Sequence, residues 1–403
     1  MKRVLFCILA LCWPLGPGPL AADLMGFWSI TQRGANSFNR LPPTQAYFDA
    51  LAGTGASWVR LAYDKWESED RDFLLGDADV YDSLNVHDLA TLLDTLDRAH
   101  RAGLKVVVAP LSLPLMRWAQ NNNGAFDDRL WQHQRNWSEA VAFWRDLALA
   151  LREHPAVAAY NLVNEPAPER ESELPEHAPG AQGVAWYTAR QGSGRDLPAF
   201  YAQVVSAIRE VDPHTPVMLD AGWYAAADGF DYWPAPLKDP RTLYSVHMYE
   251  PYEATSNPAM LKPKPGQRLY PYPGLAPFAG ETQQWGRARV ADYLGQFTRW
   301  ARHVGLPAQR LVVGEFGCLR RWPGCVTYLD DVLTTLDKEG MHWAFYAFRE
   351  DAWDGMDYEL GTTPVPWAYW KAADAGLPDP VPRQGSALFE VIARRLQPRP
   401  EQP

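Results

Sequence analysis

Short apolar stretches recur along the chain at intervals that leave room for a helix between them. Each is four to eight residues long, too short for a helix of its own, which is typical of strands buried on both faces in a parallel sheet. Eight strands are predicted, over Gly26–Ile30, Ala56–Ala62, Leu104–Leu111, Val157–Val163, Pro216–Asp220, Leu243–Met248, Leu311–Gly314 and His342–Phe348.

Helical patterns lie between most of these strands. From Val86 to Leu96, apolar residues recur at helical spacing, and Gly103 follows the pattern's end. Asn136, three residues before Glu139, predicts a capping box at the start of the helix before the fourth strand. Further helices are predicted from the apolar patterns that begin at Trp137, Leu197, Val290 and Val326.

Repeated alternation of strand and helix predicts an α/β chain folded as a single closed (β/α)8 TIM barrel. The helix after the fifth strand has the weakest pattern, because prolines interrupt residues 229–240. Two connections are long, residues 166–195 after strand 4 and 250–287 after strand 6. Loops of this length are usually functional or disordered, and their prolines and aromatic residues favour ordered walls of a cleft.

The first 22 residues have the pattern of a secretory signal peptide. Lys2 and Arg3 precede an apolar run from Val4 to Trp13, and a small-residue cleavage site follows at Ala21–Ala22. The run is too short to cross a bilayer, and no other stretch could cross one. We therefore expect a signal peptide over 1–22, one domain over 23–397, and a proline-rich disordered tail over 398–403, in a secreted or periplasmic protein.

Two cysteines remain after removal of the signal peptide, Cys318 and Cys325, with six residues between them. An oxidising compartment favours a disulfide between them, and two free buried thiols are the alternative. The bond would brace the chain just after Glu315.

Charge and aromatic content narrow the class of ligand. The net charge of −10 disfavours a nucleic-acid partner. Aromatic residues make up 13% of the chain, with 18 Trp, which suits the flat C–H faces of sugars, although a tryptophan-rich core is the alternative. The histidines other than His247 lack metal-ligand spacing, so we expect no metal site.

Two glutamates end predicted strands. Glu165 follows the strand Val157–Val163, and Glu315 follows Leu311–Gly314. The carboxyl ends of barrel strands form one face, where chemistry is usually carried out. Glycoside hydrolysis uses such a pair, because one carboxyl group must protonate the leaving oxygen while its partner stays ionised. Glycoside hydrolysis by two carboxyl groups needs no organic cofactor either.

Five short motifs lie near strand ends in a fixed order, and together they resemble those of the cellulase-type glycoside hydrolases, family five, of the retaining (β/α)8 clan. The resemblance covers nearly all of the chain after the signal peptide. The motifs are Arg33-Gly34-Ala35-Asn36, Trp58-Val59-Arg60, Asn164-Glu165-Pro166, Ser245-Val246-His247-Met248-Tyr249 and Gly314-Glu315-Phe316-Gly317.

The resemblance implies that Glu165 is the acid/base and Glu315 the nucleophile. It also implies retention of configuration, for which the two carboxyl groups should lie about 5–5.5 Å apart. Arg60 would hold Glu315 ionised and oriented through its forked guanidinium. Asn164 would donate a hydrogen bond to the sugar 2-hydroxyl.

Other expected substrate-binding residues follow from the last strands. His247 and Tyr249 are two residues apart, so both side chains point to the same side of their strand. Tyr346 is expected to replace the tryptophan platform that is common after the family's eighth strand. The histidine common at the end of the third strand is also missing here, since that region reads Ala-Pro-Leu-Ser-Leu-Pro over 109–114. Further platform candidates, or rim packing, are Trp118, Trp223 and Trp353.

We therefore expect a monomeric secreted retaining β-glycoside hydrolase acting on a polysaccharide or oligosaccharide, with no membrane contact after signal cleavage. An endo-β-1,4-glucanase is the leading hypothesis. A β-mannanase or an exo-β-glycosidase is the alternative enzyme, and a catalytically inert carbohydrate-binding barrel is the alternative class. Both glutamates are present, which disfavours the inert barrel. The sugar, the linkage and the number of subsites stay open.

Overall fold

The computed structural model describes residues 24–178, 180–261, 269–350, 355–375, 383 and 385–397. The predicted signal peptide (1–22), the predicted tail (398–403) and Trp353 lie outside the described residues.

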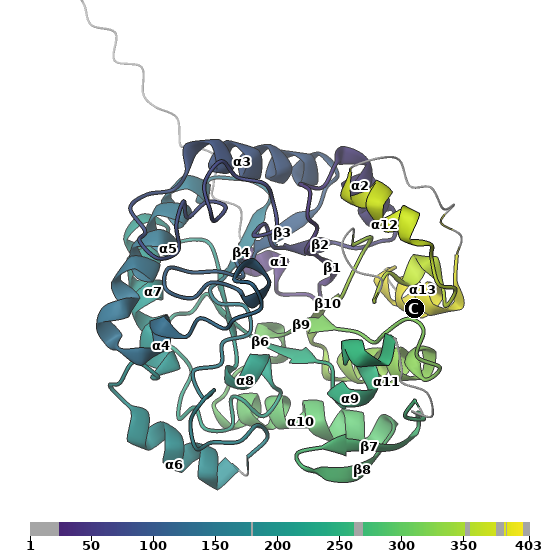
Figure 1. Ribbon diagram of the computed structural model, residues 1–403. Coiled ribbons are helices and arrows are strands. Elements are labelled where there is room, and N and C mark those ends of the chain that lie inside the picture. Colours follow the sequence, from purple (N-terminus) through teal and green to yellow (C-terminus); the bar gives the residue numbers. More distant parts are fainter. Residues whose placement is uncertain are drawn as a thin grey trace, which may run out of the picture.

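Eight parallel strands close into a barrel, which confirms the predicted TIM fold (Figure 1). Their order around the barrel is β1-β10-β9-β6-β5-β4-β3-β2. Chain neighbours are barrel neighbours, as short right-handed crossovers require. The strands are β1 (Arg33–Ser37), β2 (Trp58–Leu61), β3 (Lys105–Val108), β4 (Val157–Asn161), β5 (Val217–Asp220), β6 (Thr242–Met248), β9 (Leu311–Phe316) and β10 (His342–Phe345).

Long helices pack around the barrel through their apolar faces. They are α2 (Gln45–Gly53), α3 (Val86–Arg101), α5 (Trp137–Leu151), α7 (Leu197–Val211), α10 (Arg287–His303), α11 (Cys325–Glu339) and α13 (Ala387–Leu396). Between β5 and β6 the described chain holds only the four-residue turn α8 (Gly222–Ala225), where the sequence pattern was weakest.

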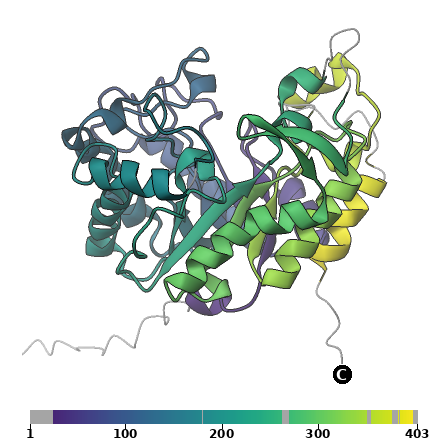
Figure 2. The ribbon, with the colours of Figure 1, turned by 90° about the horizontal axis from the view of Figure 1, so that it is seen from below.

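The remaining described elements precede the first strand or lie in the loops. They are α1 (Leu24–Phe27), α4 (Arg129–Gln132), α6 (Gly180–Arg190), α9 (Tyr252–Thr255), α12 (Trp367–Asp374), the hairpin β7 (Gly274–Phe278) and β8 (Glu281–Trp285), and the 3-10 turns η1 (Ala119–Asn121), η2 (Gln134–Asn136), η3 (Pro258–Leu261), η4 (Ala308–Arg310) and η5 (Tyr358–Leu360). The two predicted long loops thus carry α6 after β4, and α9 with the hairpin after β6. In side view, the hairpin and these loops rise at the barrel end opposite α1 (Figure 2).

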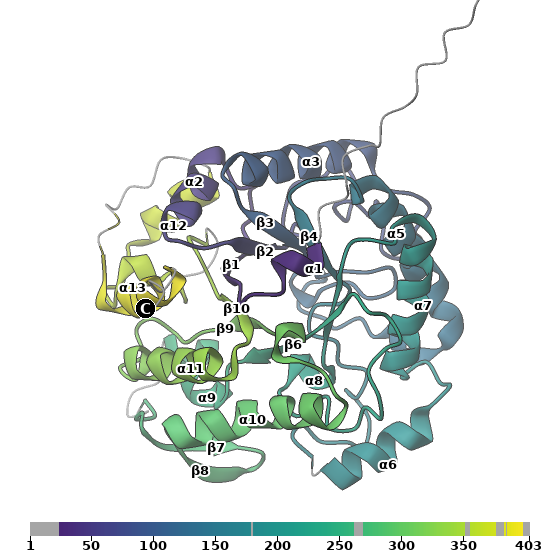
Figure 3. The ribbon, with the colours of Figure 1, turned by 180° about the vertical axis from the view of Figure 1, so that it is seen from behind.

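The predicted first strand, Gly26–Ile30, is wrong. Its first residues belong to α1, and the strand is β1, Arg33–Ser37. Helix α1 lies across the barrel end that is seen from behind (Figure 3). Trp28, the residue after this helix, is fully buried, and its indole Nε1 donates to the Ala158 carbonyl at 3.1 Å. The apolar pattern over residues 26–30 therefore belongs to residues that close the end of the barrel. The true strand β1 has a polar sequence, because its Asn36 faces the barrel interior.

The predicted capping box is also wrong. Helix α5 begins at Trp137, but the Asn136 side chain makes no capping hydrogen bond. Its amide nitrogen donates to the Arg129 carbonyl at 2.5 Å, and Glu139 accepts from the Tyr81 N–H at 2.9 Å. The side chains of Asn136 and Glu139 thus bond to residues outside the helix and do not cap it.

The predicted disulfide is confirmed, since Cys318 and Cys325 are bonded. Both are buried between the end of β9 and the start of α11. As for membranes, the described helices include none with the length and apolarity needed to cross a bilayer.

The barrel interior is apolar at its lower end and polar above. A small cluster around Trp28, Trp58 and Val312 fills the lower end. Higher up, buried polar side chains from six strands point inward, namely Asn36, Arg60, Asn161, Asp220, His247 and Glu315. A buried polar layer at the carboxyl ends of barrel strands is the expected place for an active site.

Candidate active site

Arg60 forms the floor of the polar layer. It comes from β2, and its side chain is completely buried. One terminal nitrogen donates to Glu315 Oε1 at 2.5 Å, and the other donates to Asn164 Oδ1 at 2.7 Å. Its Nε donates to Asn161 Oδ1 at 2.7 Å. The guanidinium is thus held on three edges and brings Glu315 and Asn164 together.

Glu315 lies on β9 with both carboxylate oxygens engaged. Oε1 accepts from Arg60, and Oε2 accepts from the Tyr249 hydroxyl at 2.8 Å. The residue is 4% exposed. A cation and a hydroxyl donor on opposite oxygens stabilise its negative charge and fix the direction in which the carboxylate points.

Glu165 follows β4 in a left-handed backbone conformation, with φ of 48°. Its N–H donates to Asp220 Oδ2 at 3.2 Å, which anchors the residue to β5. Burial raises the pKa of its carboxyl group, and the nearby Glu315 charge raises it further, against the lowering effect of a hydrogen bond with His247. Glu165 therefore holds a proton to higher pH than an ordinary glutamate.

His247 on β6 connects the two acids. Its Nδ1 lies 2.8 Å from Glu165 Oε1 and 3.8 Å from Glu315 Oε1. Burial lowers the pKa of the imidazole, but the charges of Glu315, Asp220 and Glu165 outweigh burial, so the net shift is upward. The imidazole of His247 therefore holds its second proton to higher pH than an ordinary histidine.

The distance between the carboxyl groups is short. One carboxylate oxygen of Glu165, one ring nitrogen of His247 and one oxygen of Glu315 lie within 4.8 Å of one another. Three such groups have the spacing of metal ligands as well. The Arg60 guanidinium, 2.5 Å from Glu315, already supplies the positive charge that a cation would add.

Sequence reasoning gave no site role to three residues of this network, namely Asn36, Asn161 and Asp220, although Asn36 stands in the first of the five motifs. Asp220 is completely buried, lies 3.5 Å from Arg60 and receives hydrogen bonds from Asn161 and Glu165. It ends a predicted strand, which is the same signal that identified the two glutamates. Asn36 donates to the Gly314 carbonyl at 2.9 Å, directly beside Glu315.

Tyr346 follows β10 at the edge of the same site. Its ring packs edge-on against Phe38, with centroids 5.2 Å apart. Burial raises the pKa of its hydroxyl well above the usual range, and the charges of Glu350, Glu315 and Glu165 add to the shift. Tyr346 therefore lies near both acids, on the side of β1 and β10.

A cavity of about 600 Å³ opens beside Glu165. His247 and Tyr249 line its base, and Trp223 is in its wall. Its remaining walls come from the loop after β4, the start of the loop after β6 and the β7–β8 hairpin. A smaller cavity of about 120 Å³ also reaches Glu165 and is lined by Trp118.

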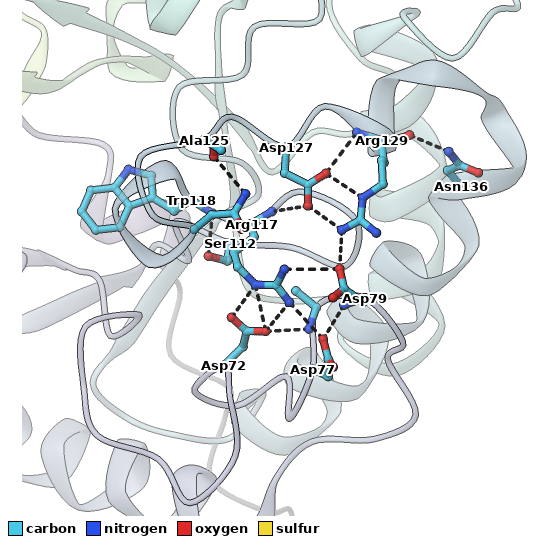
Figure 4. A network of polar contacts seen from close by, with 12 residues as sticks. Asp72, Asp77, Asp79, Ser112, Arg117, Trp118, Ala125, Asp127, Arg129 and Asn136 are labelled. Carbon is cyan, nitrogen blue, oxygen red and sulfur yellow. Dashed lines mark hydrogen bonds and ion pairs between the residues drawn. The ribbon is translucent and has the colours of Figure 1, made fainter.

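An ion-pair network fixes the wall beside Trp118 (Figure 4). Arg117 pairs with Asp72 at 2.7 Å and with Asp77 at 2.9 Å, joining the loop after β2 to the loop after β3. Arg129 binds Asp127 at 2.7 Å in the same network. Arg117 directly precedes Trp118, so the network sets where this tryptophan leaves the backbone.

Curated relatives cover only part of this chain. A β-xylosidase from Phanerodontia chrysosporium is 23% identical over 248 residues, which are 59% of this chain and 42% of the relative. A probable glucan 1,3-β-glucosidase A from Neosartorya fischeri is 26% identical over 211 residues, 52% of this chain and 43% of the relative. The matches span less than half the length of either relative.

Solved structures match over most of the chain. The endoglucanase Cel5A of Thermotoga maritima with cellobiose has a TM-score of 0.59 at 15% identity, covering 92% of this chain and 100% of that one. The Pseudomonas stutzeri endoglucanase Cel5A with cellobiose has a TM-score of 0.57 at 17% identity, and the match covers 91% of this chain and 92% of that one. The Thermotoga maritima enzyme with mannotriose has a TM-score of 0.56 at 15% identity, and the match covers 81% of this chain and 92% of that one. At these identities the likeness shows a shared fold.

A family model settles the relationship that fold alone leaves open. The model described as cellulase, glycosyl hydrolase family 5, matches residues 24–352, from the barrel plug to beyond the last strand. The chain belongs to glycosyl hydrolase family 5, the cellulase family.

Proposed function

We propose that this protein is a retaining β-glycoside hydrolase that acts as an endo-β-1,4-glucanase. The observation that carries the proposal is that one carboxylate oxygen of Glu165 lies within 4.8 Å of one carboxylate oxygen of Glu315. Retaining enzymes have carboxyl groups about 5–5.5 Å apart, whereas inverting ones need about 6.5–9.5 Å to seat a water. The spacing supports attack by a carboxylate on the sugar.

In the first step, a Glu315 oxygen forms a bond to the anomeric carbon. The glycosidic carbon–oxygen bond breaks, and its electron pair goes to the leaving oxygen, which takes the proton of Glu165. The raised pKa of Glu165 supports this role, because the group must still carry a proton near neutral pH.

In the second step, Glu165 is a carboxylate and accepts a proton from water. The water oxygen bonds to the anomeric carbon, and Glu315 leaves as a carboxylate. His247 lies 2.8 Å from Glu165 and is able to stabilise it in this ionised state.

Asn164 is proposed to bind the substrate through its amide nitrogen. Its Oδ1 accepts from Arg60 at 2.7 Å, which leaves the NH₂ group to donate. A donor beside the nucleophile suits the sugar 2-hydroxyl, whose hydrogen bonds strengthen in the transition state. Tyr346 is proposed as a platform on the glycone side, opposite the larger cavity.

The choice of glucan rests on the relatives. Two matched structures are endoglucanases with cellobiose, and one of those enzymes was also solved with mannotriose. A β-mannanase or an exo-β-glycosidase is therefore the second candidate, the latter favoured by the β-xylosidase and glucosidase relatives. The disulfide supports export, and we retain the proposed signal peptide over 1–22, one catalytic domain over 23–397 and a monomeric state.

The test is product analysis on a panel of β-glucans, mannans and xylans, with the anomer observed by NMR during the first minutes. The proposal expects β-anomers to appear first, and short cello-oligosaccharides released from within the chains. α-Anomers appearing first would contradict retention, and release of single sugars from chain ends would replace endo by exo action.

A further inference from the structure

The turn after β5 has an unusual backbone. Trp223, Tyr224 and Ala225 all have positive φ, at 46°, 58° and 63°. The left-handed region disfavours residues with a Cβ, and it is normally visited one residue at a time. Three in a row persist only where surrounding contacts impose them, and such strain is concentrated at functional sites.

Glu169 supplies one of these contacts. It lies in the loop after β4 and is 1% exposed. Its Oε2 accepts from the Trp223 N–H at 3.0 Å, and its Oε1 accepts from the Tyr232 hydroxyl. Burial raises the pKa of this carboxyl group, while its two hydrogen bonds lower it. One buried carboxyl group therefore ties the start of the turn to a residue that follows it.

Gly222 makes this close approach possible. A Cβ at that position would lie 2.1 Å from Glu169 Oε1 and 2.3 Å from the Tyr232 hydroxyl. Its φ is not positive, so backbone freedom does not require glycine here; the space taken by the Glu169 carboxyl group does. Only glycine at position 222 leaves room for the Glu169 carboxyl group.

The turn stands directly beside the proposed acid. The Tyr224 N–H donates to the Pro166 carbonyl at 3.1 Å, and Pro166 follows Glu165. Tyr224 lines both cavities that meet at Glu165, and Trp223 lines the larger one. Because Glu165 protonates the departing oxygen, these two aromatic side chains form the wall that faces the leaving group.

We propose that Glu169 is a positioning residue, which holds the left-handed turn so that Trp223 and Tyr224 seat the leaving-group sugar against Glu165. The inference rests on the proposed glycosidase function and assigns Glu169 a role in leaving-group specificity. It touches neither the substrate nor the two catalytic acids.

The test compares two substrates that share a glycone. Cellotetraose has a sugar leaving group that must reach the turn and be protonated. Dinitrophenyl β-cellobioside has a small leaving group that departs without protonation. For Glu169→Ala, kcat/KM on cellotetraose should fall at least tenfold, while that on the aryl glycoside changes less than threefold.

Three further variants distinguish loss of the positioning role of Glu169 from a general loss of activity. In Glu169→Gln, the amide oxygen still accepts from Trp223, and its NH₂ donates to a rotated Tyr232 hydroxyl, so activity on cellotetraose should stay within threefold of wild type. Tyr232→Phe removes one donor and should lower kcat/KM on cellotetraose selectively but less. Glu173→Ala, an exposed change in the same loop, should affect neither substrate.

The outcomes are distinguishable. Equal losses on both substrates, or no loss on cellotetraose in folded Glu169→Ala, would overturn the positioning role. If that variant does not fold, the same criterion applies to Tyr232→Phe. A wild-type protein that cleaves neither substrate would instead refute the proposed function on which the inference rests.

Discussion

At the scale of single residues, the site works by placing two identical side chains in different surroundings. Glu315 receives donors on both oxygens, from Arg60 and Tyr249. The pKa of Glu165 is instead raised by burial and by the charge of Glu315, against the lowering effect of its hydrogen bond with His247. An acid and a nucleophile require surroundings of this kind, in which one carboxyl group keeps its proton and the other stays ionised.

The pKa of Glu165 should therefore fall when the charge of Glu315 is removed. In Glu315→Gln, the repulsion that raises this pKa is lost, while burial remains and keeps the pKa above that of a free glutamate. Carbon-13 NMR of labelled Glu165, titrated in both proteins, measures the difference. An unchanged or higher pKa in the variant would mean that the two groups do not interact as described.

Arg60 should not tolerate replacement by lysine. Lys retains the charge but cannot donate to Glu315, Asn164 and Asn161 at once. We expect kcat/KM to fall about 100-fold, a loss of about 2.7 kcal/mol in transition-state stabilisation. Arg33→Lys is the matched control, since Arg33 pairs with Asp337 on the barrel exterior at 3.1 Å. Equal behaviour of the two variants would argue against the assigned role.

At the scale of elements, the walls of the cleft are loops joined by a few buried polar contacts. His177, in the loop after β4, lies 3.1 Å from Asp228 and 3.3 Å from Glu250, which belong to the loops after β5 and β6. Its ring stacks on Phe278 of the hairpin, with centroids 4.4 Å apart. One imidazolium thus joins four segments around the larger cavity.

The stabilisation from His177 should depend on pH. Burial lowers the pKa of His177, but hydrogen bonds to Asp228 and Glu250 outweigh burial and raise it to about 10. A raised pKa stabilises the fold fully below the ordinary value of about 6.5, and the gain declines until it is lost near pH 10.

The melting temperature of His177→Gln should therefore lie well below that of wild type at pH 6, and the difference should shrink as pH rises to 10. The control is His87→Gln, at an exposed position in α3. A deficit that stays constant with pH would show that the ion pairs contribute nothing.

At the scale of the whole molecule, strand-end acids in the sequence were enough to locate the barrel face and its two glutamates. Two features were not predicted, strand β1 and the left-handed turn at Trp223. Strand β1 was missed because Asn36 makes it polar where it meets the site, whereas apolar Trp28 plugs the barrel. The left-handed turn at Trp223 has no local signal, because the carboxylate that accepts from the Trp223 N–H belongs to Glu169, more than fifty residues earlier.

The disulfide should stabilise the molecule without taking part in catalysis. It closes a loop of Cys318 to Cys325, for which the chain-entropy model gives about 2–3 kcal/mol. Cys318→Ala/Cys325→Ala should therefore lower the free energy of unfolding by that amount in urea, with kcat changed less than threefold. A tenfold loss of kcat at full folding would place the bridge in the catalytic machinery.

A covalent bond between Glu315 and the sugar is the step that defines the proposed reaction. Incubation with dinitrophenyl 2-deoxy-2-fluoro-β-cellobioside, followed by intact-mass and peptide mass spectrometry, tests it directly. We expect one fluorocellobiosyl group per chain, attached to the peptide that contains Glu315, and none in Glu315→Ala. Turnover of natural substrate without any adduct, or an adduct on another residue, would contradict the account.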